Sequence, residues 1–424
     1  MRRIARENAL CASMAGAGSA AMAWLGLYGF AWNDYDNEAR PAVDALVHGH
    51  VLEFLRIAPA YGGSLIERAP FALLPGLWGG GQLAMYRMLA LPCLLAAAML
   101  GMWLVGRMRA NGRSTLSWGV ALGLCVANPL TLRALELGHP EELLGACLCV
   151  AAVLLASRDR PLLAAATLGM AIANKEWALL AAGPIILALP AKRRLSCIAL
   201  AAVTAAAIMA PLALVSSGSF VTGARGAAAP PATIFQPWQA WWFLGHHGAL
   251  VHGLFGAPKP GYRVGPSWVG MVSHPLILLT GLALTATLWL TRRWRSGAGA
   301  RLLEPDALLA LALLLLLRCI LDTWDTVYYL LPFVFALLAW EVGAFSERPP
   351  LLTLSLTALA WIGFEWLPTR ASADAQAAFF LAWSLPLAVS LAFASCTPGR
   401  VLVDERKLLR QARKPLVPAV THQS

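Results

Sequence analysis

Two aspartates that could do chemistry lie just after the first apolar stretch of the chain. Residues 30–50, FAWNDYDNEARPAVDALVHGH, contain Asp34 and Asp36 as an Asp-x-Asp pair, at the end of an apolar run over residues 9–32. A carboxylate at this position can act as a general base or offer oxygen ligands to a divalent cation. An acidic cap on the helix expected to begin near Pro41 is the structural alternative. We predict a functional role for at least one of the two, and the sequence does not choose between them.

A histidine and a lysine occur at two later turns between apolar segments. In LELGHPEELLGA, Pro140 followed by two acids is an ordinary helix start, which leaves His139 without a structural reason. In GMAIANKEWALLAAGP, Lys175 could hold a phosphate as a compact cation. It could also pair with a neighbouring acid or extend its ammonium group to the interface. Both side chains are candidates for binding substrate.

Two arginines are further candidates for an anionic ligand. Arg68 lies in YGGSLIERAPFALLPGLWGGG, residues 61–81, whose apolar part is too short to span a membrane and is predicted to be re-entrant or interfacial. It could bind a phosphate, or pair with Glu67 or another nearby acid. Arg318 lies inside an apolar run, in LLRCILDTWDTVYYLLPF, and shares a helix face with Asp322, four residues later. It could bind an anionic headgroup, oriented by Asp322, or form a self-contained ion pair with that aspartate.

Aromatic side chains complete the set of candidate substrate-binding residues. Trp238 lies in IFQPWQAWWFLGHHG, where tryptophans flanked by amides suit flat sugar rings or isoprenoid chains. An aromatic belt at the membrane interface is the alternative. Tyr328 follows Asp322 in the segment LDTWDTVYY. The neighbouring histidines His246 and His247 have no obvious third ligand, so no metal site is predicted there.

The composition is that of a membrane protein. The mean hydropathy of the 424 residues is +0.64, and 59% of them are apolar. Only 13% are charged, whereas a soluble domain would carry roughly twice that fraction. The net charge of +11 does not indicate nucleic acid as a partner, because the basic residues form short clusters between apolar runs. The eight cysteines lack zinc or CxxC spacing, so neither disulfides nor a metal is predicted.

The positions of the basic clusters predict the topology. If every cluster faces the cytoplasm, an even number of helices must separate neighbouring clusters, and each interval has room for two. We therefore predict about twelve helices with both termini in the cytoplasm. The first is expected to be an uncleaved span, because residues 9–32 exceed the usual length of a signal-peptide core.

This layout predicts a single all-α domain over residues 1–399, a polytopic bundle of transmembrane helices. Long outer loops are expected at about residues 33–80, with interfacial helices, and at about residues 216–272. Residues 400–424 are predicted to form a basic cytoplasmic tail. The candidate residues all fall on the outer side, where ionisable groups at membrane depth are commonly functional.

Four motifs together resemble those of a known family. They are the acidic motif after the first helix, GHPEE at 138–142, NKEW at 174–177, and LRCILDTWDTVYYLLP. The chain resembles integral-membrane glycosyltransferases of the GT-C fold, in particular the glycosyltransferase 87 group, which is polyprenyl-phosphate-mannose-dependent and mannosyltransferase-like. The similarity of layout covers most of the chain. It implies a GT-C-like fold, a cell-envelope enzyme in the cell membrane, and catalysis without a tightly held metal or other cofactor.

The resemblance also implies roles for the candidate residues. The partners would be a polyprenyl-phosphate sugar donor with a mannose-like sugar, a lipid or glycan acceptor, and the surrounding membrane lipids. The acceptor hydroxyl would attack the anomeric carbon on the outer side, Asp36 or Asp34 would take its proton, and one displacement would invert the centre. The leaving phosphate would need cations, for which Lys175, Arg318 and Arg68 are the candidates.

Two alternatives to this function remain at this point. A transporter or lipid flippase commonly has twelve helices with both ends in the cytoplasm. Transporters, however, carry charge near the bilayer midplane and are built from repeated halves. Here the charge is predicted at one face, and no matching halves are visible. A relative that kept the GT-C fold and lost its activity is the second alternative, because a fold does not fix a function.

Overall fold

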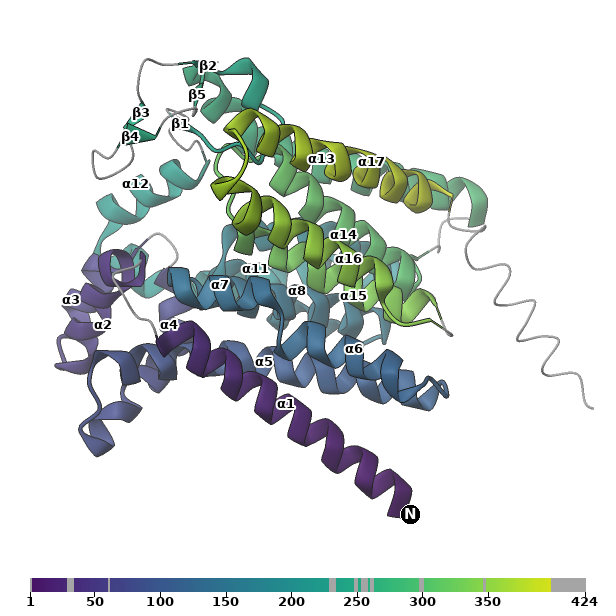
Figure 1. Ribbon diagram of the computed structural model, residues 1–424, viewed down its shortest axis with the longest axis horizontal. Coiled ribbons are helices and arrows are strands. Elements are labelled where there is room, and N and C mark those ends of the chain that lie inside the picture. The colour runs from purple at the N-terminus through teal and green to yellow at the C-terminus, as the bar shows by residue number, and fades with distance from the viewer. Residues whose placement is uncertain are drawn as a thin grey trace, which may run out of the picture.

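The computed structural model is a bundle of long helices with almost no strand (Figure 1). It describes residues 2–28, 34–59, 62–228, 234–247, 251–252, 258–259, 263–296, 301–345 and 348–397. The predicted basic tail, residues 400–424, lies outside the described residues, as do parts of both predicted outer loops. The prediction of an all-α polytopic bundle is confirmed.

Eight segments within the described residues are long and apolar enough to cross a membrane. They are Gln82–Ala110 (α5), Thr115–Leu137 (α6, Thr115–Val126, and α7, Pro129–Leu137), Pro140–Ser157 (α8), Ala191–Val215 (α11), Ser267–Thr291 (in α13, Ser267–Ser296), Val327–Ala344 (η5, Val327–Leu330, and α15, Leu331–Ala344), Leu351–Thr369 (α16, Leu351–Trp361, η6, Ile362–Trp366, and η7, Leu367–Thr369) and Ala373–Cys396 (α17). Two shorter apolar segments, Pro161–Asn174 (α9) and Glu176–Ala188 (η3, Glu176–Ala181, and α10, Ala182–Ala188), join them. The count of about twelve crossings stays a prediction.

The most buried part of the bundle is formed by α8, α14 (Glu304–Leu321) and α15. These helices pack against one another and are buried around almost their whole circumference, as expected of helices enclosed by others. Glu141 and Glu142 at the start of α8 and Arg318 near the end of α14 interrupt this apolar centre. A long N-terminal helix, α1 (Arg2–Tyr28), packs along α5, α6 and α7 (Figure 1).

Short helices gather at the end of the bundle opposite the N-terminus (Figure 1). They are η1 (Tyr35–Ala39), α2 (Arg40–Val47), α3 (Val51–Ile57), α4 (Gly62–Ala72) and η2 (Leu74–Trp78). Interfacial helices were predicted for this part of the chain, and their depth in a membrane stays a prediction. The helix α4 packs against α5, α9 and α11 and carries Arg68 into the bundle.

The second predicted outer loop contains regular structure. It begins with α12 (Ser217–Ala228), followed by an antiparallel sheet of β1 (Ile234–Phe235), β5 (Arg263–Val264) and β2 (His246–His247), in that order. A second pair joins β3 (Val251–His252) to β4 (Pro258–Lys259). The amide of Ala240 donates to the carbonyl of Ile320 at 2.7 Å, and the Trp241 indole donates to that of Leu321 at 2.6 Å. These bonds tie the loop to the end of α14.

Gly63 sets how closely α4 approaches α9. A Cβ at this position would overlap the backbone carbonyl oxygen of Ala173. We predict that Gly63→Ala lowers the thermal midpoint of the detergent-solubilised protein, because moving α4 away from α9 costs about 1–3 kcal/mol. In the matched control Gly76→Ala, the added Cβ meets nothing within 4 Å, so the midpoint should not change. Thermal unfolding is monitored by tryptophan fluorescence. Equal midpoints for the two variants would contradict this account.

Candidate active site

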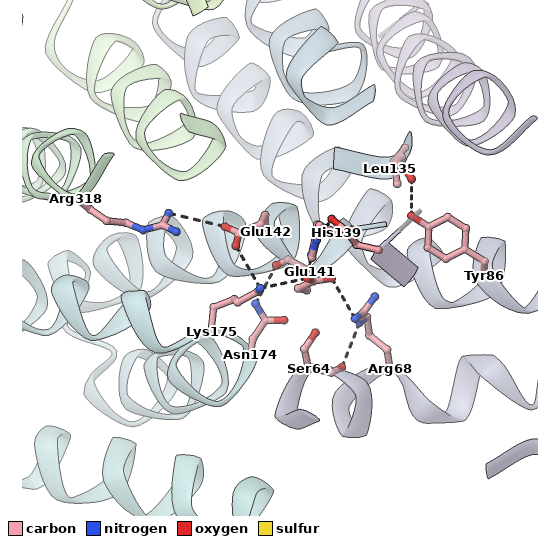
Figure 2. Close-up of polar contacts among 11 residues, drawn as sticks. Ser64, Arg68, Tyr86, Leu135, His139, Glu141, Glu142, Asn174, Lys175 and Arg318 are labelled. Carbon is pink, nitrogen blue, oxygen red and sulfur yellow. Dashed lines mark hydrogen bonds and ion pairs between the residues drawn. The ribbon is translucent and has the colours of Figure 1, made fainter. Parts of the chain in front are cut away.

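His139 lies at a sharp turn between two helices. The helix α7 ends at Gly138, whose φ of 95° lies in the left-handed region that glycine adopts without strain. Pro140 then starts α8 at the first helical position. The turn leaves His139 buried between the two helices, among the polar side chains of neighbouring segments (Figure 2).

The His139 imidazole links two carboxylates. Its Nδ1 lies 2.8 Å from Oε1 of Glu141, and its Nε2 lies 3.2 Å from Oδ2 of Asp34. The Glu141 side chain is 1% exposed, whereas that of Asp34 is 49% exposed. The imidazole therefore connects a buried carboxylate to one that solvent or a substrate can reach.

The two carboxylates keep the His139 ring protonated. Burial by itself lowers the pKa of His139, but the charge of Glu141 and the hydrogen bonds to Asp34 and Glu141 outweigh it and raise that pKa to about 9. At neutral pH both ring nitrogens therefore carry hydrogen, and each donates to one carboxylate. This occupies Oδ2 of Asp34, while Oδ1 has no hydrogen-bond partner within the described part of the chain.

Glu141 joins the largest number of these charges. Nζ of Lys175 lies 3.3 Å from its Oε1, and Nη2 of Arg68 lies 3.4 Å from its Oε2 (Figure 2). The Asn174 side-chain amide donates to its backbone carbonyl at 2.9 Å. Because an unpaired charge inside a protein is very costly, these partners are what permits the Glu141 carboxylate to be buried.

Glu142 holds the remaining cation. Its Oε1 lies 3.5 Å from Nζ of Lys175, and its Oε2 lies 4.0 Å from Nη1 of Arg318 (Figure 2). Lys175 thus lies between two carboxylates, whereas Arg318 has one long ion pair and donates to the carbonyl of Tyr329 at 3.4 Å. The positive charge of Arg318 is therefore less fully neutralised than that of Lys175.

Aromatic rings cover the charged groups. The Tyr328 ring stacks on His139 with 4.8 Å between ring centroids. The Arg318 guanidinium lies over the ring of Tyr329, 4.4 Å from its centroid, and over that of Trp177, at 5.2 Å. Contacts of this kind attract a cation to the ring face and exclude water. Tyr328, predicted to bind substrate, is buried and forms a wall of the site.

These contacts define a charged cluster of seven side chains: Asp34, Arg68, His139, Glu141, Glu142, Lys175 and Arg318. With His139 protonated, its cations exceed its carboxylates by one, so an anionic ligand would suit it better than a cation. Within the described residues, no group of three or more His, Cys, Asp or Glu side chains is arranged to hold a metal ion.

Asp36 and Asp322 have partners outside the charged cluster. The Asp36 carboxylate is 9% exposed and accepts a hydrogen bond from Arg40 at 2.9 Å. Oδ1 of Asp322 accepts from the amide of Trp324 at 3.2 Å and lies 3.4 Å from Nε2 of His274. Asp322 therefore caps the turn after α14, and no ion pair within 4.0 Å joins it to Arg318 among the described residues.

Trp238 contributes to packing in this structure. Its indole N–H donates to the carbonyl of Gly363 at 3.1 Å, and its ring stacks on Phe364 with 4.5 Å between centroids. The side chain is buried between the second outer loop and η6 (Ile362–Trp366). The structure thus brings His139, Lys175, Arg68 and Arg318 together with Asp34 and Tyr328, and leaves Trp238, Asp36 and Asp322 outside the group.

Two residues central to the charged cluster were not predicted to bind or react. The sequence explained Glu141 and Glu142 as a helix start, and the structure makes them the counter-ions of four cations, the protonated His139 included. A signal was present, because two adjacent acids open a helix that is otherwise apolar, where carboxylates are costly. The contacts of Asn174 and Trp177 were also not predicted from the sequence.

The fold and the site together define a membrane protein with a buried charged cluster at one end of its helical bundle. Residues 63–319, more than half of the chain, match the family model of glycosyltransferase family 87. The chain belongs to this family and is a membrane glycosyltransferase, which acts on a sugar donor and an acceptor. The family resemblance drawn from the sequence is confirmed. No curated protein and no solved structure gives a significant match.

Glu141→Gln should be among the most destabilising isosteric changes in this chain. It leaves Arg68 and Lys175, both largely buried, with one carboxylate fewer, at a cost of about 3–5 kcal/mol. We expect a clear fall in the thermal midpoint of the purified protein. The exposed neighbour of Lys175, Glu176, provides the matched control, and Glu176→Gln should leave the midpoint unchanged. A midpoint of Glu141→Gln equal to that of the wild type would rule out this network as a source of stability.

Proposed function

We propose that this glycosyltransferase moves a sugar from a polyprenyl-phosphate donor to a hydroxyl of a lipid or glycan acceptor, with Asp34 as the general base. One observation carries the proposal: the hydrogen-bonded chain Asp34–His139–Glu141, which is joined by ion pairs to buried cations. A base that accepts the acceptor proton and cations that balance a phosphate are the two parts that this reaction needs.

The geometry favours Asp34 over Asp36 as the base. Asp34 is accessible and has one carboxylate oxygen left over after its bond to His139. Asp36 is mostly buried and is paired with Arg40. In the proposed step Oδ1 of Asp34 takes the proton as the acceptor oxygen attacks the anomeric carbon. The bond from that carbon to the phosphate oxygen breaks, its electrons stay on the phosphate, and the centre is inverted.

His139 is a positioning residue in this proposal. Both of its ring nitrogens are engaged, so the ring cannot rotate without breaking a charged hydrogen bond. Its fixed orientation aims the Nε2–H at Oδ2 of Asp34 and leaves Oδ1 for the acceptor. Glu141 and the stacked Tyr328 ring hold the imidazole from behind.

Arg318 is the strongest candidate for the donor phosphate. Lys175 and Arg68 already lie within 3.5 Å of carboxylate oxygens, whereas the ion pair of Arg318 with Glu142 spans 4.0 Å. A guanidinium can also present two parallel N–H groups to a phosphate. Lys175 and Arg68 then contribute by keeping the charged cluster positive overall as charge builds on the leaving group.

We place the site on the extracytoplasmic side of the cell membrane and both termini in the cytoplasm. Arg68 lies in α4 and Asp34 directly precedes η1, so the charged cluster lies near the end of the bundle where α2, α3 and α4 gather. The N-terminus lies at the other end (Figure 1). At that other end Arg109 pairs with Glu7 at 2.9 Å, and further basic residues follow α5. Cytoplasmic segments are enriched in lysine and arginine, which supports this orientation.

Asp34→Asn should abolish most of the transferase activity. Without a proton acceptor beside the attacking hydroxyl, we expect kcat to fall by about 10²–10⁴-fold, with less effect on KM. Transfer of radiolabelled mannose from polyprenyl phosphomannose in isolated membranes measures this, with the amount of folded protein checked in parallel. Asp36→Asn is the matched control and should reduce kcat less than tenfold, because it weakens only the ion pair with the half-exposed Arg40. If Asp36→Asn lost more activity than Asp34→Asn, the base would be Asp36 and the assignment to Asp34 would be wrong.

Activity should fall on the alkaline side as His139 loses its proton. Its folded-state pKa of about 9 lies above the ordinary 6.5, so the charge-assisted bonds are complete at pH values below 6.5 and are lost as pH rises through 9. The pH profile of kcat should therefore show an alkaline limb near pH 9. In His139→Gln, which cannot titrate, that limb should be absent and the remaining rate lower. An unchanged alkaline limb in this variant would exclude His139 as its origin.

A further inference from the structure

Several buried polar atoms around Arg318 have no hydrogen-bond partner within the part of the chain that the structure describes. Oε2 of Glu142, Nε1 of Trp177 and both carboxylate oxygens of Asp325 make no hydrogen bond of normal geometry within the described residues. Asp325 is completely buried, with the amide of Thr326 beside it. Buried polar groups are nearly always satisfied, so each exception needs an explanation. Here the exceptions come from three separate segments: two of them contact Arg318, and the third, Asp325, interacts with it electrostatically.

The contacts of Arg318 show that these groups are neighbours. Its guanidinium lies 4.0 Å from Oε2 of Glu142 and 5.2 Å from the ring centroid of Trp177. Asp325 is close enough to interact electrostatically with both Arg318 and Glu142. Among the described residues, the Arg318 side chain makes one hydrogen bond, to the carbonyl of Tyr329. The group therefore combines unfilled donors on the arginine and indole with unfilled acceptors on two carboxyl groups.

This mixture of groups selects among possible occupants. A bare cation is disfavoured by Arg318 and by the neighbouring Lys175, and a second anion, in addition to a phosphate on Arg318, is disfavoured by Glu142. A neutral hydroxyl can donate to a carboxylate oxygen and accept from an indole or a guanidinium at the same time. Several hydroxyls fixed on one ring would satisfy several of these atoms together.

We propose that Glu142, Trp177 and Asp325 form the subsite that recognises the hydroxyls of the donor sugar, next to the Arg318 that takes its phosphate. The proposal rests on the proposed function, because the phosphate on Arg318 is what brings the sugar to these residues. The sugar is a neutral hexose, since a uronic acid would place a second carboxylate beside Glu142. Asp325 is the residue that determines which hexose is accepted, because each of its oxygens is available to a hydroxyl.

Asp325→Leu tests the subsite without removing a hydrogen bond of normal geometry. The replacement is similar in size and takes away a buried carboxyl group that has no hydrogen-bond partner within the described residues, so the thermal midpoint should stay equal or rise. Donor binding is measured in the Asp34→Asn background, where the donor is not consumed, by titrating polyprenyl phosphomannose against tryptophan fluorescence. We expect the dissociation constant to rise by roughly tenfold or more.

Donors that lack single hydroxyls identify which sugar hydroxyl each side chain of the subsite recognises. Polyprenyl-phosphate mannose lacking one hydroxyl at a time should bind the parent protein more weakly, again by roughly tenfold for the recognised position. In Asp325→Leu, removal of the recognised sugar hydroxyl should no longer weaken donor binding. In Trp177→Phe, the loss of affinity should disappear for a different hydroxyl of the sugar. Asp325→Asn, which keeps one acceptor oxygen, should restore part of the binding. Glu67→Gln is the control, because Glu67 is another carboxyl with no hydrogen-bond partner but lies outside the subsite.

Two failures can be told apart. If the deoxy penalties are the same in the parent and in Asp325→Leu while the parent binds donor, water satisfies these atoms and the subsite is overturned. If polyprenyl phosphomannose does not bind the parent and the wild type transfers no sugar from it, the proposed function fails and the subsite with it. Loss of the penalty at one hydroxyl in Asp325→Leu, with the control unchanged, supports the subsite.

Discussion

The rest of the site depends on one buried carboxylate, that of Glu141. It contacts His139 on one oxygen and Arg68 on the other, and it shares Lys175 with Glu142. These partners come from α4, from the turn before α8 and from the end of α9, so a single charge fixes three segments against one another. The two adjacent acids at the start of α8 therefore hold cations at defined positions inside an apolar bundle.

Much of the fold follows from the sequence, and part of the site does. Long apolar runs separated by basic clusters require a helical membrane bundle, and Gly138 with Pro140 predicts the turn at His139. The approach of Asp34 to His139 could not be predicted, because these residues are 105 positions apart and no local pattern encodes the distance. The same holds for Trp238, whose surroundings are set by Gly363 and Phe364.

The site divides its two tasks between neighbouring carboxylates. Glu141 is coupled through His139 to the accessible Asp34, and Glu142 is coupled to Arg318. Lys175 bridges the two halves at 3.3 Å and 3.5 Å. A charge that changes at one half is therefore felt at the other across a short, poorly screened path, which suits a reaction in which one proton and one phosphate charge change together.

The order of these charges along the chain bears on how the protein enters the membrane. The acids open α8 and Lys175 follows α9, and these two helices pack against each other as neighbours in sequence. The pair can therefore insert as a hairpin that carries its own counter-charge, which lowers the penalty for placing carboxylates in lipid. Arg318 is synthesised much later and finds Glu142 already in place. Arg68 of α4 precedes this pair in the chain, the pair itself adds a nearly neutral unit, and the last cation arrives with α14.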